Sequence, residues 1–180
     1  KAGADSANAG GRALSAATAS LDGEWLLATD PANAGRDGKW WAAPRPDAKP
    51  TKVPWIIQDP FPGYHGVAWY WREFVAPTNP HPQGRGLLRF WAVDYKADVW
   101  LNGQLAGGHP YGYSNFYVAA DGFLKYGQEN QIEVVAHNEN EPNSRWYSGS
   151  GIYRHAWLIV ADPVHIAHWG TWVTTPEVTA

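Results

Sequence analysis

The richest potential binding chemistry in the sequence lies in residues 143–154, which read NSRWYSGSGIYR. Arg145 and Arg154 supply planar donor forks, and three aromatic side chains supply flat faces. Such groups suit a polyhydroxylated or anionic small molecule. Glycines in this segment allow backbone turns that a β-carbon would hinder. The alternative is an aromatic-rich loop that closes one end of a β-sandwich, a structural role that fits Tyr153 and Arg154 best.

Paired carboxylates are the next candidates, because cleavage of a glycosidic bond requires two of them flanking that bond. The chain offers Asp94 with Asp98, and Glu139 with Glu141. The first pair is expected to cap a turn between strands by accepting backbone N–H groups. The second pair falls in a polar loop that is expected to be solvated. We therefore assign no catalytic residue to this chain.

Metal and cofactor chemistry finds little support in the sequence. The seven histidines do not form a close metal-ligand pattern. His165 and His168 are three residues apart in a predicted strand, which would place them on opposite faces. Cysteine is absent, so neither a thiolate site nor a disulfide is possible. Without a phosphate loop, a dinucleotide fingerprint or a nucleophile elbow, we predict neither metal nor cofactor.

Composition limits the class of partner. The 180 residues suit one domain, or one domain with tails. A formal net charge of -3 gives no basic footprint for nucleic acid. No apolar run approaches the roughly 20 residues of a membrane helix, so we expect neither nucleic acid nor a membrane as a partner. Twelve tryptophans and 14% aromatic residues favour a β-rich domain, a sugar-stacking surface, or both.

The elements that would position these residues are short strands. An all-β sandwich of the jelly-roll type is predicted, because the short strands are separated by turn residues and no amphipathic helix is evident. Asn102-Gly103 is a strong hairpin signal. Residues 30–66, with seven prolines, are expected to wrap irregularly over the surface. The predicted strands are 21–27, 67–75, 87–94, 97–101, 104–106, 114–119, 130–138, 153–160 and 164–173.

Residues 1–19 are small, polar and aperiodic, and are expected to be a flexible tail or linker. Such a segment would suit the mature start of an exported bacterial protein, periplasmic or extracellular, although no signal regions are present to show it. The compartment therefore stays open.

Five motifs occur in the order seen in one protein family, at residues 66–72, 90–103, 107–113, 124–130 and 144–154. By these motifs the chain resembles the N-terminal sugar-binding domain of glycoside hydrolase family 2. This domain is a galactose-binding-like jelly roll, and the family comprises the β-galactosidases, β-glucuronidases and β-mannosidases. The resemblance covers about residues 20–175.

The resemblance implies a jelly roll at residues 20–163 that precedes an immunoglobulin-like domain and a TIM barrel. Residues 164–180 resemble the crossover towards the immunoglobulin-like domain. In the family both catalytic glutamates belong to the barrel, so the chain is expected to be one module of a larger enzyme. Its implied partners are carbohydrate and these two other domains.

The resemblance also implies where substrate would be contacted, because loops of this domain reach the mouth of the barrel in several family members. Residues 55–59 precede the first motif, where the family also approaches the sugar, and residues 109–113 belong to a motif with a mixed structural and binding role. The implied substrate-binding residues are Asn143, Arg145, Trp146, Tyr147, Trp55, Asp59, His109 and Tyr111.

Three functional readings follow from the sequence. The first is a non-catalytic, carbohydrate-contacting and barrel-supporting domain of a family 2 hydrolase of O-glycosidic bonds, β-galactosidase-like in activity. The second is a free-standing carbohydrate-binding module that binds glycans through loop aromatics. The third, a stand-alone enzyme, has the least support. The sugar and its linkage stay open.

Overall fold

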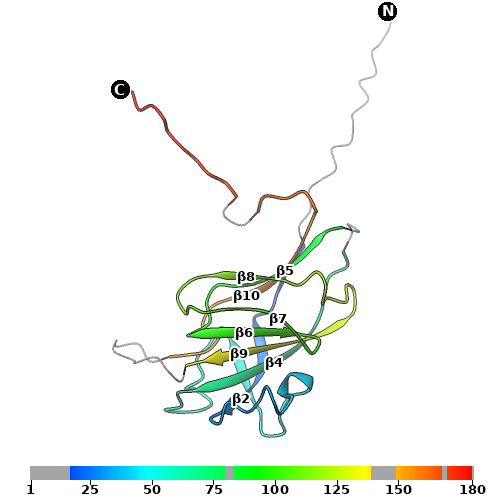
Figure 1. Ribbon diagram of the computed structural model, residues 1–180, viewed down its shortest axis with the longest axis vertical. Helices are drawn as coiled ribbons and strands as arrows, with labels where there is room; N and C mark the ends of the chain where they lie inside the picture. Colours follow the sequence, from blue (N-terminus) through cyan, green and yellow to red (C-terminus); the bar gives the residue numbers. More distant parts are fainter. Residues whose placement is uncertain (1–16, 80–82, 139–148, 168–169, 180) are drawn as a thin grey trace, which may run out of the picture.

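The computed structural model describes residues 17–79, 83–138, 149–167 and 170–179. Within them the chain forms ten strands and one short 3-10 helix, and the strands make two antiparallel sheets (Figure 1). The elements are β1 (Ala17–Ser20), β2 (Gly23–Asp30), η1 (Trp40–Ala42), β3 (Lys49–Val53), β4 (Val67–Val75), β5 (Arg85–Phe90), β6 (Lys96–Leu101), β7 (Gln104–His109), β8 (Phe116–Ala119), β9 (Glu129–His137) and β10 (Ala156–Ala161).

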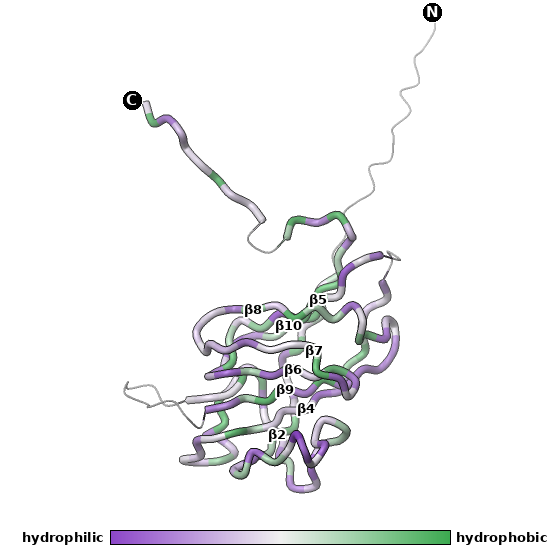
Figure 2. Tube along the Cα trace, viewed as in Figure 1, coloured by the Kyte–Doolittle hydropathy of each residue, from purple (hydrophilic) through white to green (hydrophobic). Residues whose placement is uncertain are grey.

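The two sheets pack face to face as a β-sandwich, which confirms the predicted fold class. The larger sheet has the order β3-β2-β4-β9-β6-β7, and the smaller has the order β1-β10-β5-β8. Along the strands hydrophobic and hydrophilic residues tend to alternate (Figure 2), which directs one set of side chains between the sheets. The hairpin predicted at Asn102-Gly103 joins β6 to β7, with φ of 50° and 78° at its two central residues.

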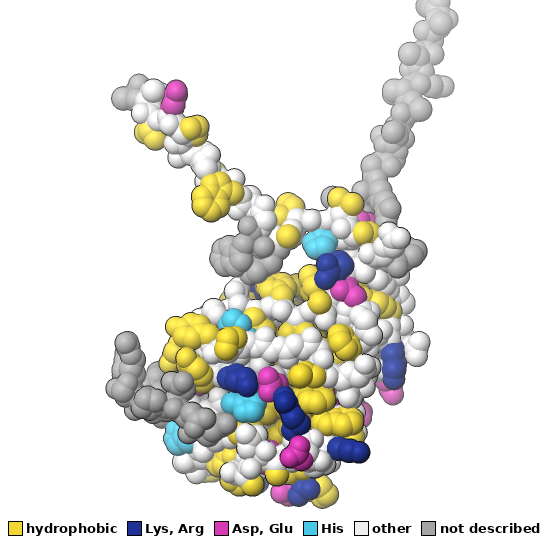
Figure 3. Space-filling view, in the orientation of Figure 1, with side chains coloured by type: hydrophobic (Ala, Val, Ile, Leu, Met, Phe, Trp, Pro, Cys, Tyr) yellow, Lys and Arg dark blue, Asp and Glu magenta, His cyan; other side chains and the backbone are white. Residues whose placement is uncertain are grey.

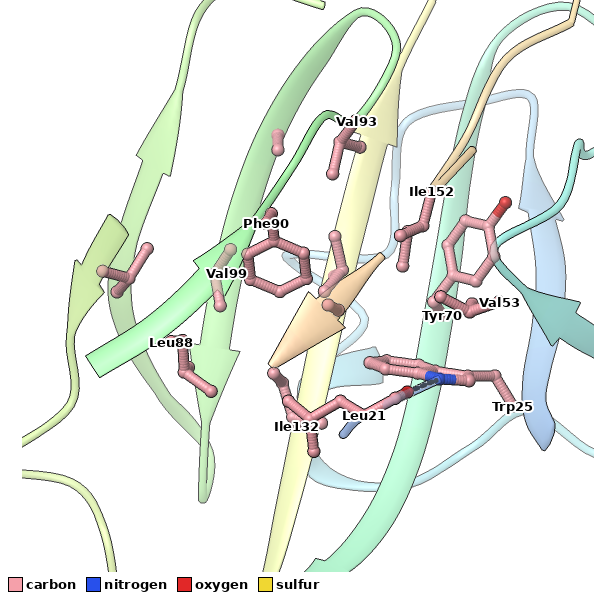
Figure 4. Close-up of a cluster of buried hydrophobic side chains, with 14 of the residues drawn as sticks. Leu21, Trp25, Val53, Tyr70, Leu88, Phe90, Val93, Val99, Ile132 and Ile152 are labelled. Carbon is pink, nitrogen blue, oxygen red and sulfur yellow. Dashed lines mark hydrogen bonds between the residues drawn. The ribbon is translucent and has the colours of Figure 1, made fainter. Parts of the chain in front are cut away.

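The main core lies between the sheets and contains large, fully buried side chains. Figure 4 shows Tyr70, Phe90 and Ile132 directed into this space. The Trp25 indole N–H donates to the Leu21 carbonyl at 2.8 Å, so its one polar atom is satisfied inside the core. Burying each such side chain contributes about 1.5–3 kcal/mol.

A second apolar cluster covers the outer face of the larger sheet. The buried side chains of Trp69, Trp71 and Val135 pack there against Trp40 and Trp41 of η1. The Trp71 indole N–H donates to the Trp40 carbonyl at 2.7 Å, which fixes the helix on the sheet. The proline-rich segment therefore folds back over the sheet and is held by its tryptophans.

The same segment contains a strand where the sequence analysis predicted irregular structure. β3, Lys49–Val53, pairs with β2 alone and includes Pro50. Proline is tolerated at the edge of a sheet, because its missing N–H removes no ladder bond on the open side. The prediction of irregular structure from the number of prolines is therefore wrong for residues 49–53.

The segments near the two chain termini also differ from the expectation. β1 begins at Ala17, within the segment expected to be a tail, and pairs with β10 along its whole length. Residues 164–167 and 170–173 are not in a strand, although a strand was predicted at 164–173. Ile166 and Trp172 are exposed there. A strand depends on a hydrogen-bonded neighbour, which local pattern does not report.

Candidate functional site

Loops from four parts of the sequence meet where β9 and β7 end and where β4 and β6 begin. They are residues 54–66, 91–95, 110–115 and 149–155, and together we call them the loop end. Ile57 N–H donates to the Ser150 carbonyl at 2.9 Å, and the Tyr153 hydroxyl donates to the Gly112 carbonyl at 2.7 Å. Because each of these bonds joins two loops, the loop end is one connected unit.

Gly151 is the position on which this connection depends. Its φ of +102° disfavours any residue with a side chain, and an added β-carbon would lie 2.9 Å from Ile57 Cγ1 and closer still to the buried Tyr70 hydroxyl. Gly151 also exchanges two backbone hydrogen bonds of 2.9 Å with Asp94. The sequence analysis expected this glycine to shape the loop, and the structure gives the reason.

Four predicted substrate contacts, Asn143, Arg145, Trp146 and Tyr147, lie outside the described residues. The chain on either side of them is described and bonds the loop of residues 57–66. Asn138 N–H donates to the Gly66 carbonyl at 3.3 Å. Ser150 N–H donates to Gln58 Oε1 at 3.0 Å, and the Gln58 amide donates to Ser150 Oγ at 3.0 Å.

Trp55 and Asp59 lie together, as their proximity in sequence suggested. They line a shallow cavity of about 350 Å³, together with Glu24 and residues 50–52. The Trp55 side chain is 51% exposed, and its backbone N–H donates to the Ile152 carbonyl at 3.0 Å. The structure therefore brings this predicted pair against the C-terminal flank of residues 143–147.

His109 and Tyr111 take different roles, although they are two residues apart. The His109 ring stacks on Phe116 with 4.8 Å between centroids, and its Nε2 lies 2.8 Å from Ser114 Oγ. It holds a loop against the core. Tyr111 is 47% exposed and makes edge contacts with the rings of Tyr95 and Tyr113.

The exposed tyrosines make an aromatic surface at the loop end that the sequence analysis only partly identified. Tyr113 is 67% exposed, more than the predicted contact Tyr111. Burial, followed by the nearby charge of Asp94, raises the pKa of Tyr153. Tyr153 thus has the structural role expected of it, and the Arg154 guanidinium lies over the Trp91 ring at 5.9 Å.

The expectation that Asp94 and Asp98 cap one turn is wrong for Asp98. Asp98 lies within β6, where its Oδ2 is 3.1 Å from His137 Nε2 and 3.3 Å from an Arg36 guanidinium nitrogen. Burial by itself would raise the pKa of the Asp98 carboxyl. The His137 hydrogen bond and the charges of Lys96, His137 and Arg36 outweigh burial, and the net pKa is lowered. The contact between Asp98 and Arg36 could not be predicted from the sequence, because the two residues are 62 positions apart.

Asp98 belongs to a cavity on the outer face of the larger sheet, which we call the outer-face cavity. Its volume is about 290 Å³, and a polar rim surrounds an apolar floor. Figure 3 shows basic, acidic and histidine side chains gathered beside hydrophobic ones on the face over β6 and β9. Its lining residues are Asn33, Arg36, Asp37, Trp69, Lys96, Asp98, Trp100, Val135 and His137.

The described ranges hold neither a metal-ligand cluster nor a membrane-spanning helix. No group of three or more His, Cys, Asp or Glu side chains there could hold a metal ion. His165 Nδ1 lies 2.6 Å from the Asp162 carbonyl oxygen, and His168 lies outside these ranges. No helix in them has the length and apolarity needed to cross a bilayer.

Comparisons with known proteins place the chain beside glycosidases, although no family model matches it. It is 40% identical over 114 residues to β-galactosidase BoGH2A of Bacteroides ovatus, covering 63% of this chain. It is 33% identical over 118 residues to a putative β-glucuronidase of Formosa agariphila, covering 64% of this chain. The chain spans only 13% and 11% of these relatives.

Solved structures agree with the sequence comparisons. A β-glucuronidase of Lactobacillus rhamnosus superposes with a TM-score of 0.73 and 26% identity, over 81% of this chain and 28% of that one. A β-glucuronidase of Ruminococcus gnavus superposes with a TM-score of 0.71 and 25% identity, with the same coverage.

Proposed function

We propose that the chain, which is similar to family 2 glycoside hydrolases, is their N-terminal sandwich domain and acts as a non-catalytic, carbohydrate-contacting domain. In this proposal a parent enzyme hydrolyses β-glycosides, and the loop end of the sandwich contacts the sugar. The partners would be carbohydrate together with immunoglobulin-like and TIM-barrel domains of that parent.

The single observation that carries the proposal is the construction of the loop end. Two segments far apart in sequence meet there. Residues 54–66 are hydrogen-bonded to Asn138, which precedes residues 143–147, and to the segment 149–155, which follows them. Trp55 and Asp59 lie on one of these segments, half-exposed and beside a shallow cavity. An aromatic face beside a carboxylate suits a sugar, because it pairs an apolar surface with a hydroxyl acceptor.

Three of the described carboxylates, Asp94, Asp98 and Glu133, are held in ways that favour a structural role. Asp98 is held by three basic side chains, and the backbone of Asp94 is bridged to Gly151. Glu133 is fully buried under the tryptophans of the outer face. Glycoside cleavage needs two acids that flank one bond. No two of these three carboxylates form such a pair at an open surface.

A galactoside is the proposed substrate of the parent enzyme, because 40% identity relates the chain to a protein named as a β-galactosidase. A glucuronide is the competing choice, since a relative at 33% identity and the neighbouring solved structures carry the name β-glucuronidase.

A chimera tests the contact role directly. Residues 20–163 would replace the matching region of BoGH2A, and hydrolysis of chromogenic β-galactoside and β-glucuronide would be measured. With Trp55→Ala we expect KM to rise about fivefold, from the 0.5–1.5 kcal/mol typical of an aromatic contact.

Leu105→Ala is the matched control, because Leu105 is exposed to a similar degree but lies beside the hairpin turn of β6 and β7. It should leave KM unchanged. A folded, active chimera in which Trp55→Ala behaves like Leu105→Ala would refute the contact role.

A free-standing carbohydrate-binding module is the second candidate, favoured by the exposure of Trp55, Tyr111 and Tyr113 at the loop end. It predicts that the isolated chain binds glycans at these residues. The contact-domain proposal predicts no binding there without the barrel. An NMR titration with a glycan panel, read at the loop-end resonances, separates the two.

A further inference from the structure

We propose that the outer-face cavity is a second carbohydrate site, which takes one neutral pyranose ring through residues of this chain alone. The cavity lies on the outer face of β6 and β9 and not among the loops of the loop end. Its volume of about 290 Å³ lies just below the usual range for small-molecule sites. It is therefore matched to a single ring and not to an extended chain.

Asp98 supplies a fixed acceptor for a sugar hydroxyl. Its contacts with His137, Arg36 and Lys96 all reach the same oxygen, Oδ2, at 3.1, 3.3 and 4.0 Å. These three groups hold the carboxylate in one orientation at the wall of the cavity. The side chain is only 16% exposed, so its position is set before any ligand arrives.

Donors surround this acceptor on the rim. The side chains of Arg36 and Lys96 are 58% and 51% exposed, and each touches Asp98 through one nitrogen. A guanidinium carries five N–H donors, so most of those of Arg36 stay available to a ligand. Asn33 and Asp37 add an amide and a second carboxylate.

The floor of the cavity is apolar and rigid. Trp69 and Val135 are 2% and 3% exposed. Trp100 is fixed by stacking on Trp41 with 5.6 Å between centroids and an angle of 2°, and the Arg36 guanidinium lies over its ring at 5.8 Å. An apolar floor beneath a rim of donors and acceptors matches a pyranose, which has C–H groups on its faces and hydroxyls at its edge.

The charges favour a neutral ligand over an anion. Two cationic side chains, Arg36 and Lys96, face two carboxylates, Asp37 and Asp98. An anion would gain from the first pair but would be repelled by the second. The choice of a sugar among neutral polyols rests on the proposed function, whereas the cavity and its charges do not.

The experiment is an NMR titration of the full chain with methyl β-galactoside, methyl β-glucoside and methyl β-glucuronide. We expect the two neutral glycosides to shift the indole N–H of Trp100, assigned by its loss in Trp100→Phe, and the amides of β6 and β9. The glucuronide should bind several-fold more weakly. Asp98→Asn should weaken binding about tenfold, since hydrogen bonds to a charged group are the stronger kind.

Arg36→Ala is a second variant, because Arg36 is exposed and its loss is tolerable to the fold. Its matched control is Arg45→Ala, another exposed arginine that lies over a tryptophan ring, at 4.7 Å from Trp40, but outside the cavity. Arg36→Ala should weaken binding and Arg45→Ala should not.

The site is overturned by the absence of any shift at high millimolar glycoside, by equal weakening in both arginine variants, or by stronger binding of the glucuronide. Shifts confined to the loop end would also overturn it, while supporting a carbohydrate-binding module there. Shifts confined to β6 and β9 support this site and leave the contact role of the loop end to the chimera.

Discussion

The two ends of the sandwich are closed in different ways. At the loop end, hydrogen bonds of the backbone and of the Tyr153 and Gln58 side chains join four loops, and the aromatic side chains of Trp55, Tyr111 and Tyr113 remain exposed. At the opposite end, which we call the hairpin end, two asparagine side chains join the turn of β6 and β7 to residues 123–131. At the hairpin end polar side chains close the structure, whereas at the loop end several aromatic side chains stay at the surface.

Asn102 and Asn130 show how complete the closure of the hairpin end is. The Asn102 amide donates to Asn130 Oδ1 at 2.8 Å, and Asn102 Oδ1 accepts from Gln131 N–H at 3.0 Å. The Asn130 amide donates to the carbonyls of Lys125 and Gln128 at 2.9 Å. The hairpin predicted at Asn102-Gly103 is anchored by this network.

Gly151→Ala should produce the largest effect, because it breaks the loop end at its most crowded backbone position. The added methyl group meets Tyr70 and Ile57 at a φ of +102°. We expect a loss of about 3–5 kcal/mol in the free energy of unfolding, as strain and a steric clash combine. Urea denaturation measures it. Gly122→Ala, with open space around its added carbon, is the control and should cost less than about 1 kcal/mol.

Asn130→Ala should be next in size, and it breaks the hairpin end. Asn130 is 3% exposed and its side chain makes hydrogen bonds with the Lys125 N–H, two carbonyls and Asn102. Removing it leaves buried partners unpaired, which we expect to cost about 2–4 kcal/mol. Sugar contact at the loop end should not change. A loss of chimera activity at full stability would contradict the separation of the two ends.

Glu133→Gln tests the larger sheet, which lies between the two ends, by its effect on the pH dependence of stability. Glu133 is fully buried, opposite Trp71 and Trp100, and its carboxyl oxygens have no hydrogen-bond partner on another described residue. Burial raises the pKa of Glu133 from 4.5 to about 8. Between these values the folded state keeps a proton that the unfolded state has released. Stability should therefore fall as pH rises, by up to about 1.4 kcal/mol per pH unit.

The glutamine variant lacks this proton and should lose that slope. Denaturation midpoints at pH 5, 6.5 and 8 measure the difference, with Glu24→Gln at an exposed site as the control. We expect the variant to gain most over the parent at pH 8. Parallel stability profiles for parent and variant would contradict a buried, protonated Glu133.

Tyr113→Ala should have the smallest effect on stability. The ring is 67% exposed and contacts Tyr111 at its edge. We expect a change within about 0.5 kcal/mol, as for surface substitutions generally. Thermal denaturation measures it, with Phe116→Ala in the core as the contrasting variant. A loss above 2 kcal/mol would show that the tyrosines of the loop end are structural.

The sequence indicated part of the construction of the loop end. Glycines in residues 143–154 were expected to allow turns, and Gly151 does so where residues 55–59 bond the C-terminal flank of residues 143–147. The split between His109 and Tyr111 could not be foreseen, because it depends on which ring meets Phe116. The outer-face cavity was missed because Arg36 and Asp98 belong to segments with no pattern in common.

The sequence by itself determined the all-β class, the Asn102-Gly103 hairpin and the similarity to family 2 glycosidases. These depend on local periodicity, on turn preferences and on motif order, which are all written along the chain. Only the tertiary structure decided that Pro50 lies in an edge strand, that Asp98 faces three basic side chains, and that residues 164–167 and 170–173 form no strand. Those outcomes depend on which distant segment supplies the hydrogen bonds and charges, and that information exists only once the chain has folded.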